Sequence, residues 1–393
     1  MQRLGLTPDD FRVADDLAKL PIIERRQLQE DPARFLSDAI ERRSCLELSS
    51  GGSTGAPCTV YQDFGAVLRN AAHGERERSI IWRSVGRRFG YREAVIVGSV
   101  DRGTARRVQE FSQARSILPS AVRTVRRYFS LLDPLPDVVA ALADFAPDVL
   151  HSTYGSYLNV LFPFIHASAC KSPKPKIVTY SSDHLSDSVR RLITGTFGIP
   201  VLSTYQSIEA FKIGFECERN TGIHLNLDLY PVRIVDEAGN SLPPGETGEV
   251  VVSNLVNRAT VLLNYRLGDL ASISPDRCPC GRSLPLLSFL QGRTDEWVTL
   301  PSGRAVHPQG IRRLFGGLEE IWEYQVVQER IGVFRVEVVA RTPEHPELRE
   351  RIVSRFTDAF GEGLEVRVAL VGSIERTKSG KCRTVVVRSA GDD

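Results

Sequence analysis

The chain has 393 residues, of which 42% are apolar and 25% are charged, and its formal net charge at pH 7 is +2. These values are ordinary for a globular protein, and the small net charge gives no argument for a nucleic acid or a membrane surface as partner. The seven cysteines are an odd number scattered over a long chain, which argues against a disulfide framework. The first ten residues lack the apolar core of a signal peptide, and no apolar run approaches the ~20 residues of a membrane span. We therefore expect a cytoplasmic protein.

Short basic clusters occur at Arg87-Arg88, at Arg106-Arg107 and between Arg123 and Arg127. They lack the interleaved aromatic residues of a nucleic-acid surface. We interpret them as solvated faces of helices.

The N-terminal part is polar and helix-prone, with an interruption at Leu20-Pro21-Ile22-Ile23. A run of small hydroxyl and glycine residues then follows a short apolar stretch. Glycines accept positive φ, and successive N–H groups together with Ser and Thr hydroxyls can form a concave anion site. The run therefore predicts a loop that holds nucleotide phosphates, formed by Ser50, Gly51, Gly52, Ser53, Thr54 and Gly55. A flexible Gly/Ser turn explains these residues about as well, and a Walker loop is excluded because no Gly-Lys-Ser/Thr follows.

Strands and helices alternate over the next part of the chain. We predict helices over 63–82, 138–145, 156–169 and 185–197, and strands over 93–98, 148–150, 176–180 and 199–202. This alternation predicts parallel strands with helices on both faces, where ligands lie beyond the carboxyl ends of the strands. Tyr154, Ser181 and Tyr205 follow such ends and are candidate pocket residues, although packing in a loop explains each of them equally well.

From Leu225 onward the pattern changes to short strands with turn signals, over 228–235 and 248–254, which predicts an antiparallel, barrel-like region. After Gly292 we predict a hairpin (296–300 and 304–306), a helix (308–314), two strands (322–328 and 333–340), a helix (346–360) and a strand (364–370). The expected fold class is therefore α/β. A large N-terminal domain (1–292) has parallel sheets flanked by helices and a small barrel-like β region. A small α+β domain (293–393) follows, with a candidate hinge near 293–296.

Four further motifs extend the pattern. They are Tyr205-Gln206-Ser207-Ile208-Glu209, Tyr265-Arg266-Leu267-Gly268-Asp269-Leu270, Gly292-Arg293-Thr294-Asp295 and Thr377-Lys378-Ser379-Gly380-Lys381-Cys382-Arg383. In this order, and with the glycine-rich loop before them, they resemble the adenylate-forming superfamily of acyl-CoA ligases. The stretches Leu20-Pro21-Ile22-Ile23 and Cys278-Pro279-Cys280-Gly281-Arg282 are similar to features of its phenylacetate–CoA ligase family. The resemblance covers nearly the whole chain.

The resemblance implies an ATP-dependent, AMP-forming ligase. A carboxylate, aromatic or otherwise compact, would attack the α-phosphate of ATP, pyrophosphate would leave, and the acyl group would pass from the adenylate to coenzyme A. Negative charge accumulates on phosphate oxygens in such a reaction, so the site must supply positioned donors and a cation. The implied cofactors are ATP, Mg²⁺ and coenzyme A.

The resemblance also implies roles for individual residues. Lys381 and Glu209 are the expected catalytic residues: Lys381 would reach the α-phosphate from a mobile loop, and Glu209 would help to hold Mg²⁺. Asp269 would accept hydrogen bonds from the ribose, and Asp295 would be the hinge of a mobile C-terminal domain. The remaining expected nucleotide contacts are the loop from Ser50 to Gly55, Tyr205, Gln206, Ser207 and Arg293. The candidate walls of the acid pocket are Tyr154, Tyr157, Tyr180, Ser181 and Phe211.

The chain departs from the family pattern at four positions. Gln206 replaces a glycine, Ile208 replaces a phosphate-contacting hydroxyl residue, Leu267 stands where threonine is usual, and Cys58 stands where lysine or threonine is common. Losing one donor to developing charge typically costs ~10²–10³ in rate, so the departures imply slower adenylation or an unusual substrate. One alternative is transfer to an amine or a carrier protein, or activation of another small oxyanion in a specialised biosynthetic pathway. Another is a non-catalytic nucleotide-binding protein, although the retained Lys381 argues against it. We expect no nucleic-acid or membrane partner and a homodimer as a candidate assembly.

A second set of residues predicts a metal site. Cys217, His224, Cys278 and Cys280 supply three thiolates and one imidazole, the ligands of a closed, four-coordinate structural zinc site. Small buried cysteines and a histidine at a strand edge are the alternative, and one residue between two cysteine ligands is tighter than the usual ~2–4. The resemblance favours zinc, because some relatives carry a metal on this arrangement.

Overall fold

The computed structural model describes residues 4–50, 58–98, 100, 103–115, 124–168, 173–293, 297–306, 308–342, 346–377 and 382–388. Contacts divide the chain into two compact units. Unit 1 contains residues 1–90, 101–123 and 202–290, and unit 2 contains residues 91–100, 124–201 and 291–393. Within the described part of the chain, no helix combines the length and the apolar character that a bilayer crossing requires.

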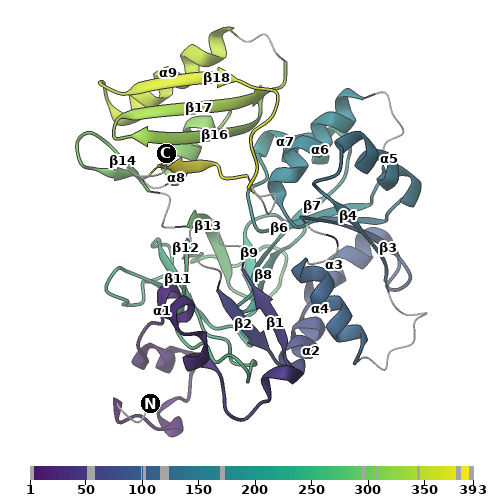
Figure 1. Ribbon diagram of the computed structural model, residues 1–393, viewed down its shortest axis with the longest axis vertical. Coiled ribbons are helices and arrows are strands. Elements are labelled where there is room, and N and C mark those ends of the chain that lie inside the picture. The colour runs from purple at the N-terminus through teal and green to yellow at the C-terminus, as the bar shows by residue number, and fades with distance from the viewer. Residues whose placement is uncertain are drawn as a thin grey trace. The chain divides into compact units, whose positions relative to one another are not determined.

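Unit 1 consists of short helices, a two-stranded hairpin and a run of antiparallel strands (Figure 1). Its helices are α1 (Arg25–Glu30), α2 (Phe64–His73), α3 (Glu75–Val85) and α4 (Thr104–Gln113). Its strands are β1 (Leu46–Ser49), β2 (Thr59–Gln62), β7 (Val201–Ser207), β8 (Phe211–Glu216), β9 (Ile223–Leu225), β10 (Val232–Val235), β11 (Gly248–Val252), β12 (Tyr265–Ile273) and β13 (Leu286–Arg293). Strands β7 to β13 follow the order β10-β11-β12-β13-β9-β8-β7, and the pairs β10–β11, β11–β12, β13–β9, β9–β8 and β8–β7 are antiparallel.

The N-terminal segment is fastened to strand β12. Ile23 forms an isolated parallel bridge with Tyr265, and its N–H donates to the carbonyl of Asn264 at 2.8 Å. The side-chain amide of Asn264, which is fully buried, donates to the carbonyls of Leu17 at 2.6 Å and Leu20 at 2.8 Å. These bonds satisfy backbone groups that would otherwise be buried without partners. As a result, the start of α1 lies beside β12.

The first part of unit 2 is a parallel sheet with the strand order β6-β5-β3-β4. Its elements are β3 (Arg92–Val97), β4 (Val125–Ser130), α5 (Leu135–Phe145), β5 (Val149–Ser152), α6 (Gly155–Ala167), β6 (Ile177–Ser181) and α7 (Asp187–Arg191). Strand β6 is buried along its whole length, as expected for a parallel sheet covered by helices on its faces.

The last part of unit 2 has its own hydrophobic core between residues 298 and 387. Its elements are β14 (Val298–Thr299), β15 (Ala305–Val306), α8 (Pro308–Phe315), β16 (Ile321–Arg330), β17 (Val333–Ala340), α9 (Pro346–Phe360), β18 (Glu365–Leu370) and β19 (Val385–Val387). The sheet order is β18-β17-β16-β19 (Figure 1). Phe315 of α8 stacks on Tyr324 with ring centroids 3.7 Å apart, and Phe356 of α9 packs against Phe334. Both helices therefore contribute to the core over this sheet.

Most of the predicted elements are confirmed, and the differences have local causes. The helix predicted over 63–82 is two helices, α2 and α3, with Gly74 between them as the C-cap of the first and the N-cap of the second. The helix predicted over 185–197 is a short α-helix that widens into π-type turns at Leu192–Thr196. The helical interpretation is wrong for two of the basic clusters. Arg87-Arg88 follows the end of α3, whose C-cap is Gly86, and Val125–Ser130 is strand β4, in which Arg126 pairs with Glu93. The division of the chain at residue 292 stays a prediction.

Candidate functional site

The hairpin of β1 and β2 brings together the two ends of the glycine-rich run. Ser49 is opposite Thr59 at the last pair of the ladder. Beyond it, the N–H of Ser50 donates to the carbonyl of Cys58 at 2.9 Å, and the N–H of Cys58 donates to the Ser50 hydroxyl at 3.1 Å. The predicted phosphate-binding residues Gly51, Gly52, Ser53, Thr54 and Gly55 lie outside the described residues. Ser50 is therefore the one member of that prediction whose position is known.

Glu209 follows strand β7 and is buried, with 4% of its side chain exposed. Side-chain amides fix its backbone: Gln62 of β2 donates to the carbonyl of Ile208 at 2.8 Å, and Asn254 donates to that of Glu209 at 2.8 Å. Its carboxylate accepts a hydrogen bond from the phenol of Tyr265 at 3.3 Å. A buried carboxylate held in this way offers the oxygen ligands that Mg²⁺ prefers.

Arg25, the first residue of α1, connects Glu209 with the end of the hairpin. One guanidinium nitrogen, Nη2, donates to the Ser50 hydroxyl at 3.0 Å, and Nη1 lies 3.8 Å from the Glu209 carboxylate. No sequence motif singles out this residue. The sequence offers one signal, which is that Arg25 lies two residues after the motif Leu20-Pro21-Ile22-Ile23. In the structure Ile23 of this motif bridges to Tyr265 of β12, which brings Arg25 close to the site.

Tyr205 and Asp269 contact each other on neighbouring parts of unit 1. The phenol of Tyr205 donates to the Asp269 carboxylate at 2.7 Å. Burial, together with the Asp269 charge, raises the pKa of Tyr205 well above its ordinary value. Burial and the nearby Glu209 charge likewise raise the pKa of Tyr265. Both phenols therefore remain protonated donors at neutral pH, each directed at one of the predicted functional carboxylates.

The other predicted nucleotide residues are less constrained. Gln206 is exposed, and the Ser207 hydroxyl accepts the N–H of Ala210 at 3.1 Å. Arg293 is described only by its backbone, as the last residue of β13. The expected hinge Asp295 and the expected catalytic Lys381 lie outside the described residues. The roles assigned to all of these residues stay predictions.

The candidate walls of the acid pocket lie in well-packed surroundings. Tyr157 and Tyr180 belong to the hydrophobic core of unit 2, where Arg190 donates to the Tyr180 phenol at 2.7 Å. Burial raises the pKa of Tyr157 to about 12. Ser181 donates to the carbonyl of Thr153 at 3.1 Å, and the part-buried Tyr154 precedes α6. Phe211 belongs to the core of unit 1. Their contact with a substrate stays a prediction.

The structure brings together all four predicted metal ligands. Within the described part of the chain, the ligand atoms of Cys217, His224, Cys278 and Cys280 all lie within 4.8 Å of one another. We call these residues the Cys/His cluster. Cys217 Sγ is 3.6 Å from Cys278 Sγ, and Cys280 Sγ is 3.4 Å from His224 Nε2. Two sulfurs bound to one tetrahedral zinc at ~2.3 Å would lie about 3.8 Å apart, so the spacing fits this ion.

The surroundings of the Cys/His cluster also fit a metal. The Nδ1 atom of His224 lies 3.3 Å from the carbonyl of Leu284, a bond that would leave Nε2 free to act as ligand. Burial lowers the pKa of His224, which keeps the imidazole neutral, as coordination requires. Backbone N–H groups of Arg219 and Arg282 point at the sulfurs of Cys217 and Cys280, at 3.4 and 3.5 Å. Such donors stabilise thiolates.

Unit 2 contains a different buried polar group next to the segment that precedes Lys381. We call it the Arg376 cluster, and it consists of Ser156, Asp183, Glu323 and Arg376. Arg376 donates to the Ser156 hydroxyl at 2.9 Å, to its carbonyl at 3.0 Å and to the Glu323 carboxylate at 2.9 Å. The Ser156 hydroxyl in turn donates to Asp183 at 2.6 Å. Burial raises the pKa of Glu323, and the Arg376 charge opposes that shift.

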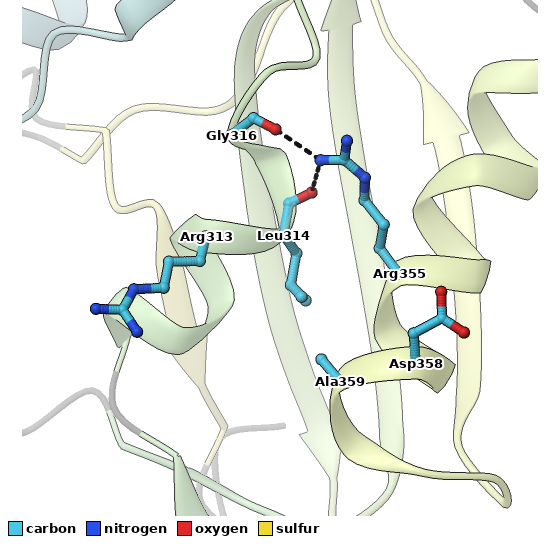
Figure 2. A pocket seen from close by; sticks show the side chains of 6 residues that line it. All are labelled: Arg313, Leu314, Gly316, Arg355, Asp358 and Ala359. Atoms are coloured by element: carbon cyan, nitrogen blue, oxygen red, sulfur yellow. Dashed lines mark hydrogen bonds between the residues drawn. The ribbon is translucent and has the colours of Figure 1, made fainter.

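A shallow hollow on the last part of unit 2 lies between α8 and α9 (Figure 2). Its lining residues are Arg313, Leu314, Gly316, Arg355, Asp358 and Ala359. Arg355 of α9 donates to the carbonyls of Leu314 at 2.6 Å and Gly316 at 2.7 Å, at the end of α8 (Figure 2). A cation that satisfies the last carbonyls of a helix is a stabilising cap. The hollow thus has a structural explanation.

Comparison with known proteins agrees with these observations. The chain is similar to the phenylacetate-coenzyme A ligase of Thermus thermophilus, with 25% identity over 425 residues that cover 98% of this chain and 90% of that protein. It is also similar to the phenylacetate-coenzyme A ligase of Escherichia coli, with 22% identity over 98% of this chain and 88% of that protein. The predicted resemblance is confirmed.

The comparisons of structure and of family models extend this result. The family model described as the CapK C-terminal domain matches residues 298–388. A crystal structure of 2-hydroxyisobutyryl-CoA ligase in the postadenylation state, in complex with R3-HIB-AMP, has a TM-score of 0.78 and 20% identity. The matched region covers 98% of this chain and 84% of the chain in that crystal structure. At this identity the likeness establishes the fold alone, and the predicted α/β fold class is confirmed.

Proposed function

We propose that this protein is an ATP-dependent, AMP-forming ligase that activates a compact carboxylic acid and transfers the acyl group to coenzyme A. The proposal is supported by similarity to phenylacetate-coenzyme A ligases over nearly the full chain. The observation that carries it is the arrangement of contacts in unit 1. Arg25 contacts both Ser50 and Glu209, and the Tyr205 phenol donates to the Asp269 carboxylate. Apart from Arg25, these residues come from three separated segments that the sequence singles out.

In the proposed first step, a carboxylate oxygen of the acid attacks the α-phosphorus of ATP, and the bond from that phosphorus to the bridging oxygen breaks. Pyrophosphate leaves and an acyl-adenylate remains. Asp269, oriented by the Tyr205 phenol, would accept hydrogen bonds from the ribose hydroxyls. The end of the hairpin at Ser50 would face the β- and γ-phosphates. Mg²⁺ held by Glu209 would supply positive charge to the phosphate oxygens.

In the proposed second step, the thiolate of coenzyme A attacks the acyl carbon, and the bond to the AMP oxygen breaks. Lys381 would act in the first step as a compact positive charge beside the α-phosphate and the carboxylate. Asp295 would be the hinge of a C-terminal domain that starts at residue 293, since enzymes often separate two half-reactions by such motion.

We also propose that the Cys/His cluster holds a structural zinc ion. Its four ligand atoms complete a tetrahedral shell and leave no open position for a substrate, so the ion would stabilise the fold rather than act in the reaction. It would fasten the loop after β8 to the loop after β12. Metal analysis of the purified protein tests this role directly.

One assay tests the main proposal. Acid-dependent pyrophosphate release, measured over a panel of aromatic and aliphatic carboxylic acids, should occur with at least one acid. Lys381→Ala should lower that rate by about 10²–10³-fold and leave ATP binding largely intact. If the wild type releases no pyrophosphate with any acid of the panel, the proposal is contradicted. Equal rates of release by the wild type and by Lys381→Ala would also contradict it. Adding coenzyme A, an amine or a carrier protein to the reaction then identifies the acceptor.

A further inference from the structure

We propose that Arg25 is a phosphate-binding residue of the nucleotide site, positioned between Ser50 and Glu209 to take a β- or γ-phosphate of ATP. This inference rests on the proposed function, and it adds a residue that the family pattern did not point to. Its basis is the geometry of the guanidinium.

Arg25 is held from both ends of the glycine-rich run. Its guanidinium donates to the Ser50 hydroxyl at 3.0 Å, and its carbonyl lies 4.0 Å from the thiol of Cys58, which is fully buried. The segment before it is fixed to β12 through Ile23. The charge of Arg25 therefore has a defined position at the end of the β1–β2 hairpin.

The guanidinium still has donors to offer. It carries five N–H groups in a planar fork, and among the described residues its one hydrogen-bond partner is Ser50. At 3.8 Å the contact with Glu209 is too long for a hydrogen bond, so it is an ion pair with little directional constraint. The Arg25 side chain is 26% exposed, whereas Glu209 is 4% exposed. A ligand can thus reach the arginine from solvent.

Because it pairs with Glu209, Arg25 has a role both in the empty site and in the site that holds a cation and ATP. Without nucleotide, the positively charged guanidinium of Arg25 lies 3.8 Å from the buried Glu209 carboxylate. When a cation and ATP bind, the cation can neutralise Glu209, and the planar fork can turn to phosphate oxygens, for which its geometry is suited. Ile208, where the family has a hydroxyl residue, packs against the apolar core and offers no donor. Arg25 supplies donors beside Glu209, the residue that follows Ile208 in the chain.

The test compares the binding of ATP and of AMP, both with Mg²⁺, by calorimetry. The variants are Arg25→Gln and Arg25→Lys, and the control is Arg26→Gln, which changes an exposed arginine of the same helix. Because a β- or γ-phosphate contact is absent from AMP, Arg25→Gln should weaken ATP binding about tenfold or more and change AMP binding less than about twofold. Arg25→Lys should give an intermediate loss, and the control should bind both nucleotides as the wild type does.

The difference between the two nucleotides separates this role from a structural one. A loss of packing alone would weaken ATP and AMP binding equally, and that result would overturn the inference, as would unchanged ATP binding. If Arg25→Gln fails to fold, the same comparison is made with Arg25→Lys. A wild type that discriminates ATP from AMP through Arg25 but releases no pyrophosphate with any acid would instead overturn the proposed function alone.

Discussion

The Cys/His cluster of unit 1 and the Arg376 cluster of unit 2 bury polar groups in two different ways. In the first, four ligand atoms point toward a common centre, and thiols and imidazole do not neutralise one another. In the second, Arg376 pairs directly with the Glu323 carboxylate and also donates to the hydroxyl and the carbonyl of Ser156. The first arrangement therefore fits an added cation, whereas the second carries its own. The comparison shows that buried charge can be balanced from outside or from within the chain.

The strongest test of this contrast removes the proposed ion. Replacing both Cys278 and Cys280 by serine should abolish metal binding and lower the free energy of unfolding by more than about 5 kcal/mol, because the binding energy of a structural ion is folding energy. Urea unfolding and metal analysis of the same samples measure both effects. Cys45→Ser, outside the cluster, is the control and should change neither. A wild type that contains no metal would end the zinc proposal.

The corresponding change in unit 2 is Arg376→Ala. It leaves the Glu323 carboxylate buried without its counter-charge, so we expect a loss of about 3–5 kcal/mol in the free energy of unfolding. Arg191→Ala is the matched control, because Arg191 pairs with Glu319 at 3.6 Å on the surface, where such pairs contribute about 0–1 kcal/mol. Equal losses in the two variants would show that burial does not distinguish these pairs.

A pH series sharpens the comparison further. Since burial raises the pKa of Glu323, the folded state holds that proton more tightly than the unfolded chain does. The resulting stability is complete below the unfolded pKa of about 4.3 and is lost as pH rises through the folded value. The wild type should therefore lose thermal stability relative to Glu323→Gln as pH is raised from about 4 to 7. If the difference in melting temperature between the wild type and Glu323→Gln stays constant over this pH range, the raised pKa of Glu323 is contradicted.

The smallest expected effect concerns a neighbour of the Cys/His cluster. The Thr221 hydroxyl lies 3.2 Å from Cys278 Sγ and supports that sulfur. Thr221→Val should lower the free energy of unfolding by about 0.5–1.5 kcal/mol and metal affinity by about 10–100-fold, measured by competition with a chelator. The control is Thr194→Val, whose hydroxyl bonds to the carbonyl of Arg190 on an exposed surface. Unchanged metal affinity in Thr221→Val would remove the hydroxyl from the site.

The sequence predicts the two clusters unequally. One residue separates Cys278 from Cys280, and ligand chemistry makes Cys217 and His224 candidate partners, but the spacing leaves buried cysteines as an alternative and the family resemblance favours the metal site. Arg376 and Ser156 are 220 positions apart, and neither lies in a motif that names the other. Arg25 was missed for the same reason. An arginine in the first turn of a helix is ordinary until the fold places Glu209 and Ser50 beside it.

The fold shows the same division. Strand β6 was predictable because it is a continuous run of mostly apolar residues. Helix α9 was predictable because its apolar residues recur with the period of a helix. Strand β4 was not, because its arginines suggested a solvated helix. In the structure Arg126 is instead drawn into an ion pair with Glu93 of the adjacent strand, a contact that depends on the pairing of β3 and β4. Tertiary pairing overrides the local signal there.

Strand β4 has a consequence for the behaviour of the protein in concentrated solution. It is the outermost strand of its sheet in the described part of the chain, so one row of its backbone groups could pair with a strand of another molecule. Charged side chains along such an edge oppose this pairing, because a docking chain would have to desolvate them. The exposed Arg127 provides that charge. An arginine that suggested a solvated helix is thus a charge of the kind that opposes edge-to-edge association of sheets.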